Sequence, residues 1–166
     1  MNAAAAAFEQ LLTLVRAAPP RAGASTVVAI DGRSGAGKST LAAKLGRELD
    51  EAPVVSLEDL YGGWDGLEHG VSLLLSEVLR PLADGNAANV PHYDWLTAAW
   101  SEPWVLAPPA QLIVEGAGAG ARSLAPYTSV PWRAATASST PPTGSAGRCR
   151  RTRSSSVSAP GCAPIS

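Results

Sequence analysis

Acidic side chains are absent from the C-terminal part of this chain, and cysteine is absent from the rest. All 14 Asp and Glu residues lie at or before Glu115, whereas the two cysteines, Cys149 and Cys162, lie after it. No apolar run reaches the roughly 20 residues that cross a bilayer, and Met1 to Ala7 carries no basic stretch of the secretory kind. We therefore expect free thiols rather than disulfides, no membrane partner and a cytoplasmic location.

Charge is divided unevenly along the sequence. Residues 1–130 hold 8 Lys plus Arg against 14 acids, a net of −6, whereas residues 131–166 hold 5 Arg and no acid, a net of +5. The N-terminal segment offers no basic groove interleaved with aromatic residues, so we expect no nucleic-acid partner. The sequence does not determine the oligomeric state.

The segment 131–166 also differs in composition from the rest. It consists mainly of Ser, Thr, Pro, Gly, Ala and Arg, with almost no large apolar residue, and such a stretch buries too little surface to offset the entropy of ordering. Pro131 would remove a hydrogen-bond donor from any central strand. We expect one domain at 1–130 and a disordered basic tail at 131–166. Because 11 Arg against 2 Lys and abundant Ala indicate a GC-rich gene, translation out of frame after about residue 130 is a second interpretation.

Short apolar strands alternate with amphipathic helices in the first 130 residues. Strands are expected at 26–30, 53–57 and 111–115, with the start of a fourth at 128–130, and helices at 3–17, 39–49 and 68–83. The stretch 89–104 is expected to be irregular. The strands are continuously apolar, which is typical of a parallel sheet covered on both faces. The pattern predicts an α/β fold with flanking helices, of the P-loop NTPase type.

A glycine-rich motif follows the first expected strand. It matches G-x-x-x-x-G-K-[ST] with Gly32, Arg33, Ser34, Gly35, Ala36, Gly37, Lys38 and Ser39, followed by Thr40 at the start of a helix. Glycines allow backbone N–H groups to converge on an anion, and the helix start adds positive potential. We expect this loop to bind ATP, with Lys38 on the β- and γ-phosphates and the Ser39 hydroxyl on Mg²⁺.

Carboxylates follow two other strands. Glu115 ends the strand at 111–115 and is expected to hold Mg²⁺, because ligands of open α/β sheets bind at the carboxyl ends of the strands. Glu58 and Asp59 follow the strand at 53–57, where an acid could accept the proton of a substrate hydroxyl. The spacing alone does not separate this role from that of an ordinary solvated loop. No guanine-specific Asn-Lys-x-Asp motif and no Leu-Ser-Gly-Gly transporter signature occurs.

In order and spacing, these motifs resemble those of uridine kinase and its phosphoribulokinase relatives between about residues 26 and 130. The resemblance is carried by the P-loop, Glu58-Asp59-Leu60-Tyr61, Trp64-Asp65, Pro91-His92-Tyr93-Asp94-Trp95 and Val114-Glu115-Gly116. That family has an Asp-x-x-Tyr element whose Asp is the catalytic base. Counting back from Tyr61 places Glu58 in that position, with Asp59 as the neighbouring alternative.

The resemblance also implies an acceptor site. Trp64-Asp65 matches an aromatic-Asp pair that holds the nucleoside ribose in the family, and the Tyr-Asp-aromatic element lines the base pocket. The acceptor-binding residues so implied are Tyr61, Trp64, Asp65, Tyr93, Asp94 and Trp95. The family's following His and Arg are replaced here by Ala98 and Trp100, and residues 131–166 contain nothing like the family's Arg-rich lid or final strand.

The leading interpretation is an ATP- and Mg²⁺-dependent kinase that phosphorylates a hydroxyl of a nucleoside or similar small metabolite. Lys38 and either Glu58 or Asp59 would carry the catalysis. One alternative is a nucleotide-binding protein without turnover, because a missing lid admits water and a missing last strand would leave the first strand with an unpaired edge. The other alternative is an ATPase or regulatory switch that uses the same loop.

Overall fold

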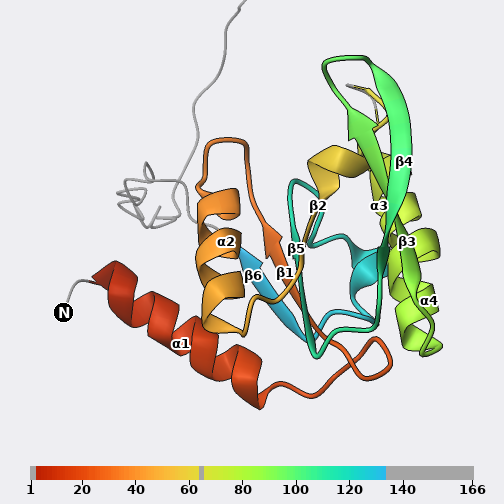
Figure 1. The fold of residues 1–166 in the computed structure, drawn as a ribbon. Coiled ribbons are helices and arrows are strands. Elements are labelled where there is room, and N and C mark those ends of the chain that lie inside the picture. The colour runs from red at the N-terminus through yellow and green to blue at the C-terminus, as the bar shows by residue number, and fades with distance from the viewer. Residues whose placement is uncertain (1–2, 64–65, 134–166) are drawn as a thin grey trace, which may run out of the picture.

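A four-stranded parallel sheet forms the centre of the molecule (Figure 1). The computed structural model describes residues 3–63 and 66–133. The strand order is β2-β5-β1-β6, and a two-stranded antiparallel hairpin of β3 and β4 stands beside the sheet. The strands are β1 (Thr26–Asp31), β2 (Val54–Ser56), β3 (Ala88–Asp94), β4 (Ala99–Leu106), β5 (Gln111–Glu115) and β6 (Val130–Arg133). The helices are α1 (Ala3–Ala17), α2 (Lys38–Glu48), α3 (Leu67–Leu73) and α4 (Arg80–Ala83), with short turns η1 (Leu57–Leu60) and η3 (Arg122–Leu124) and a π-helical segment η2 (Leu74–Leu79).

Apolar side chains cover both faces of the sheet. Helices α1 and α2 pack on one face, where Leu11 and Leu45 meet Ile30 and Ile113. The segment α3-η2-α4 and the hairpin cover the other face, where they bury Leu112 and Val114 among others. The expected α/β fold with flanking helices is therefore confirmed, and the near-continuous burial of β1 and β5 follows from their central position.

The hairpin β3-β4 contradicts the expectation that residues 89–104 are irregular. Its register changes between Val90 and His92, which marks a bulge. Two prolines, Pro91 and Pro103, interrupt the strands, and the connecting turn places Ala98 at a φ of 51°. Prolines and a bulge break the alternation by which strands are usually predicted, so the sequence conceals a hairpin that the structure contains.

The helix expected at 68–83 is present as one continuous helical segment, α3-η2-α4. Its middle turns, Leu74–Leu79, have π-helical hydrogen bonding, which the apolar spacing does not predict. Within the described part of the chain, no helix has both the length and the apolar character that crossing a bilayer requires.

Strand β6 corrects the expectation about Pro131. Val28 to Asp31 of β1 pair in parallel with Val130 to Arg133, so β1 lies between β5 and β6 and its edge is paired. Pro131 is tolerated because β6 is an edge strand, where a missing donor costs little. The expected disordered tail lies, apart from its first three residues, outside the described residues.

Candidate functional site

The phosphate loop connects β1 to α2 at the carboxyl edge of the sheet. Gly35 and Gly37 adopt φ values of 77° and 76°, which are unfavourable for residues that have a Cβ atom. Gly37 also directly precedes α2, so the helix start faces the loop. The Lys38 side chain is only 5% exposed, and its Nζ donates to the Arg33 carbonyl oxygen at 3.2 Å. The ammonium group is thus held inside the turn formed by residues 32–39.

Glu115 is the buried acid of the site. Its side chain is 4% exposed, and its Oε1 accepts hydrogen bonds from Ser39 Oγ at 3.0 Å and Ser56 Oγ at 3.2 Å. The other oxygen, Oε2, is buried and has no hydrogen-bond partner. A buried carboxylate oxygen without a partner carries a large desolvation cost, so the site is built for a cationic or donating group.

The arrangement around Glu115 fits a magnesium ion. Mg²⁺ prefers oxygen ligands and typically binds through one or two carboxylates together with water and substrate phosphates. Glu115 Oε2 and the Ser39 hydroxyl supply such oxygens next to the phosphate loop. No trio of His, Cys, Asp or Glu gathers at ligating distance among residues 3–63 and 66–133. Among the described residues, Ser39 and Glu115 are the ones that could hold such an ion together with phosphate oxygens.

A cavity of about 500 Å³ opens beside the phosphate loop. It is lined by Ser34, Glu58, Tyr61, Gly63, Leu67 and Trp95. Ser34 belongs to the loop, whereas Glu58 and Tyr61 lie in or next to η1, directly after β2. Trp95 reaches across from the hairpin, and its Nε1 donates to the Glu58 carbonyl oxygen at 3.0 Å. The cavity thus joins the expected nucleotide side to the expected acceptor side.

Asp59 differs from Glu58 in its surroundings. It does not line this cavity, and its Oδ2 lies 3.9 Å from His92 Nδ1 on β3. Burial raises the pKa of the Asp59 carboxyl above its ordinary value, the His92 imidazole opposes this rise, and the charge of Glu58 adds to it. Of the two neighbouring acids, only Glu58 lines this cavity.

Tyr61 connects the cavity wall to the loop after Glu115. Its hydroxyl donates to the Ala117 carbonyl oxygen. Burial, reinforced by the negative charges of Glu58, Glu115 and Asp31, raises the pKa of Tyr61 to about 12. The phenol therefore remains protonated at neutral pH, and its proton is engaged in a structural hydrogen bond.

The remaining expected acceptor residues are distributed around the hairpin. The Tyr93 ring makes edge-on contacts with Trp95 and Trp100, at centroid distances of 5.4 and 5.3 Å. Asp94 is engaged in the hairpin turn, where its Oδ1 accepts from the Leu96 N–H at 2.8 Å. Trp64 and Asp65 lie outside the described residues.

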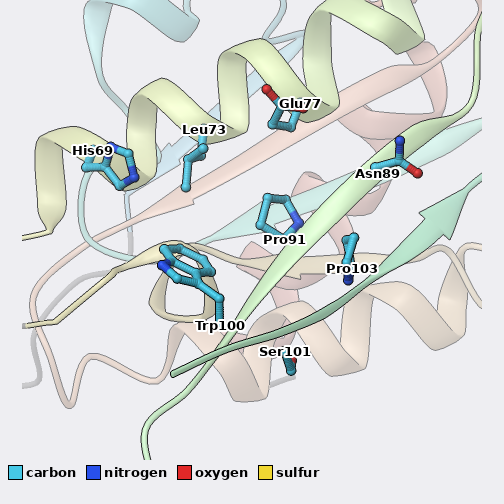
Figure 2. Close-up of a pocket in the computed structure, with 8 residues that line it drawn as sticks. All are labelled: His69, Leu73, Glu77, Asn89, Pro91, Trp100, Ser101 and Pro103. Atoms are coloured by element: carbon cyan, nitrogen blue, oxygen red, sulfur yellow. The ribbon is translucent and has the colours of Figure 1, made fainter. Parts of the chain in front are cut away.

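A second cavity, of about 330 Å³, lies between the α3-η2 segment and the hairpin (Figure 2). The helical segment contributes His69, Leu73 and Glu77, and the hairpin contributes Asn89, Pro91, Trp100, Ser101 and Pro103. The Trp100 ring lies edge-on to His69 at 6.4 Å and also contacts Tyr93. Trp100 therefore belongs to an aromatic cluster with Tyr93 and Trp95, and Trp95 of this cluster lines the first cavity.

Two residues that sequence reasoning missed hold the site together. Ser56 is the register partner of Glu115 across β2 and β5, which explains its hydrogen bond to that carboxylate. Asp31 ends β1 directly before the phosphate loop, and it accepts hydrogen bonds from the Gly32 and Gly118 N–H groups. The only sequence signal for either residue is the position of Asp31 directly before the motif. The Ser56–Glu115 and Asp31–Gly118 contacts join segments far apart in the sequence, and a single sequence does not bring them together.

Comparisons with solved structures support the fold assignment. Over 76% of this chain and 78% of the other, the structure resembles a possible uridine kinase from Bacillus stearothermophilus, with a TM-score of 0.61 and 22% identity. Over 80% of this chain and 74% of the other, it resembles a candidate fructose transport system kinase from Silicibacter sp. TM1040, with a TM-score of 0.57 and 21% identity. No protein-family description matches the sequence, and no curated protein does.

The likeness to these two kinases and the features described above concern the same fold. The chain has the fold of the P-loop kinases, with a phosphate-loop motif, a buried acid on the neighbouring strand and an open cavity at the same edge of the sheet. At identities of 21–22% this likeness concerns the fold.

Proposed function

We propose that this chain is an ATP- and Mg²⁺-dependent kinase that phosphorylates a hydroxyl group of a nucleoside-like or similar small metabolite. The observation that carries the proposal is the shared cavity, which is lined by Ser34 of the phosphate loop and by Glu58. A phosphoryl donor on the loop and an acceptor hydroxyl beside Glu58 would therefore lie next to each other. Such positioning accounts for much of the catalysis in phosphoryl transfer.

The reaction assigns a role to each side chain. Lys38, together with the loop N–H groups, would bind and neutralise the β- and γ-phosphates. Ser39 and Glu115 would hold Mg²⁺, which supplies charge neutralisation on the phosphates when bound. The acceptor oxygen would attack the γ-phosphorus, its proton would pass to the Glu58 carboxylate, and the bond from the γ-phosphorus to the β–γ bridging oxygen would break to release ADP.

The acceptor side favours a ring-bearing compound. Trp95 lines the cavity and belongs to an aromatic cluster with Tyr93 and Trp100, and aromatic faces stack on planar rings. No Lys, Arg or His lines this cavity among the described residues. These features support an uncharged nucleoside-like acceptor.

ADP release distinguishes the proposed kinase from the two alternatives. The purified chain is titrated with ATP and Mg²⁺, and ADP is then measured with and without a panel of nucleosides and small sugars. Release that depends on an acceptor supports the kinase. Binding without release supports a nucleotide-binding protein, and release without any acceptor supports an ATPase.

The first test of the site uses the two lysines of the chain, both on α2. Lys38→Ala should lower ATP affinity at least 100-fold, because the buried ammonium group would be lost from the phosphate loop. Lys44→Ala is the matched control, because Lys44 instead lies over the Phe8 ring at 3.6 Å. ATP titration followed by fluorescence measures both variants, and equal affinities would refute the assignment of the loop.

A further inference from the structure

Asp31 occupies an unusual position for a carboxylate. It is the last residue of β1 and directly precedes Gly32, the first residue of the phosphate-loop motif. A negative charge beside a polyphosphate site opposes nucleotide binding, so we expect contacts of Asp31 that offset this cost. Its two oxygens make such contacts.

One oxygen of Asp31 ties two loops together. Its Oδ1 accepts from the Gly32 N–H at 2.9 Å and from the Gly118 N–H at 3.1 Å. Gly118 lies in the loop that follows Glu115, and Gly120 of that loop approaches so closely that an added Cβ would lie 2.8 Å from Asp31 Oδ2. The hydroxyl of Tyr61 holds the same loop from the acceptor side, through Ala117.

The other oxygen of Asp31 faces a cation from β6. Arg133 Nη1 lies 3.6 Å from Asp31 Oδ2, and the two residues are register partners across β1 and β6. The Asp31 side chain is 15% exposed and that of Arg133 is 81% exposed. The guanidinium group therefore offsets the charge of Asp31 from the solvent side.

We propose that Asp31 is a positioning residue that fixes the phosphate loop relative to the loop after Glu115, and that Arg133 neutralises Asp31 so that its charge does not repel the nucleotide. Neither residue needs to touch the substrate. The loop contact is a property of the free chain, whereas the effect on nucleotide binding rests on the proposed function.

The loop contact is tested on the full chain without nucleotide, by hydrogen exchange at the Gly118 amide. Asp31→Ala removes both accepted hydrogen bonds and should speed this exchange about tenfold, the factor for one charge-assisted hydrogen bond. Asp31→Asn keeps an accepting oxygen and nearly the same side-chain shape. The exchange rate at Gly118 in this variant should therefore stay within about threefold of the wild-type rate. Exchange at Gly118 that is equally fast in all three proteins would overturn the positioning role.

The charge effect is tested with ATP and Mg²⁺ at low salt. Arg133→Ala should weaken ATP binding about three- to fivefold, the range for an exposed ion pair, whereas Arg133→Lys should stay close to the wild type. In the Asp31→Asn background, Arg133→Ala should have almost no effect, because no carboxylate remains to be neutralised. Arg21→Ala, before β1 at the opposite end of the sheet, is the matched control.

Equal losses from Arg133→Ala in both backgrounds would overturn the neutralising role, because Arg133 would then act independently of Asp31. A wild-type chain that binds no ATP would instead refute the proposed function. In that case hydrogen exchange at Gly118 still decides whether Asp31 ties the two loops together.

Discussion

At the scale of single residues, the two neighbouring acids after β2 differ in what they can reach. Glu58 lines the cavity beside the phosphate loop, while Asp59 is paired with His92 on the hairpin. A proton acceptor must lie within hydrogen-bond reach of the hydroxyl that it activates. The sequence resemblance left both acids open as the base, and we propose Glu58 because, of the two, only Glu58 lines this cavity.

This difference predicts separate effects on turnover. Glu58→Gln should lower kcat at least 100-fold, since general-base catalysis typically contributes a factor of that order or more. Asp59→Asn should lower kcat less than about tenfold, because it weakens only a contact with the hairpin. ATP affinity should be unchanged in both variants. Steady-state kinetics with an acceptor identified from the panel measure the effects, and a larger loss in Asp59→Asn would reverse the assignment.

Tyr61 gives a prediction about stability and its dependence on pH. Tyr61→Phe should lower the free energy of unfolding by about 1 kcal/mol at pH 7, because the Ala117 carbonyl loses its donor. The pKa of this phenol is raised from 10.0 to about 12 in the folded chain, so its protonation favours the folded state. That contribution is complete below pH 10 and declines as the pH rises towards 12.

Urea unfolding between pH 7 and pH 12 tests the role of Tyr61. The wild type should lose its advantage over Tyr61→Phe progressively above pH 10. A stability difference that stays constant across this range would show that the hydroxyl is not held in the way that the structure indicates.

At the scale of elements, the sequence predicted well those segments that carry a clear signal in their own residues. The helix at 3–17 and the strand at 111–115 have the expected bounds, because an amphipathic repeat and a short apolar run each carry their own signal. The phosphate loop was equally clear, since its glycines serve a local backbone shape. Apart from the hairpin and the extent of β6, the order of elements along the chain was therefore predicted from the sequence.

The hairpin was missed because its strands lack the alternation of apolar and polar residues by which strands are usually predicted. Its strands contain Pro91 and Pro103 as well as a bulge, and its turn has Ala98 rather than glycine in a left-handed conformation. The hydrogen bonds of Ser56 to Glu115 and of Asp31 to Gly118 were hidden for another reason, because they join segments far apart in the sequence. Such contacts depend on which strands become neighbours, and one sequence alone does not state the strand order.

Asp94 offers a test of how the hairpin turn is held. Hydrogen bonds, chiefly from the Leu96 N–H and then from Thr97, lower the pKa of the Asp94 carboxyl below its ordinary value of 3.8. A lowered pKa means that the charged form favours the folded state, so this contribution is complete above pH 3.8 and is lost as the pH falls through the lower, folded value.

Asp94→Ala should therefore destabilise the chain at pH 7, and its deficit against the wild type should shrink below pH 3.8. Asp94→Asn keeps an accepting oxygen without the charge, so its stability at pH 7 should lie between those of the wild type and Asp94→Ala. Urea midpoints at pH 7 and pH 3 measure both effects. A deficit that grows on acidification would contradict the turn contact.

At the scale of the whole molecule, the described contacts place the boundary of the folded unit at or beyond Arg133. β6 pairs with β1 through Arg133, and its Val130 is buried against the α1-α2 side of the sheet with Trp132 packed on the same cluster. The strand that carries the phosphate loop is thereby shielded on both edges. Composition alone placed the boundary at residue 130, because Pro131 masked the last strand.

Two shortened chains test where folding ends. A chain that stops after Arg133 should keep the unfolding free energy of the full chain to within about 1 kcal/mol, because every element described by the structure is retained. A chain that stops after Ser129 should lose about 3 kcal/mol or more, because it exposes the apolar surface covered by Val130 and Trp132 and leaves the edge of β1 unpaired. Urea unfolding measures the free energies, and light scattering reports aggregation through the open edge. If the chain ending at Arg133 unfolds as readily as the one ending at Ser129, residues beyond 133 take part in folding, and the expectation of a disordered tail is wrong.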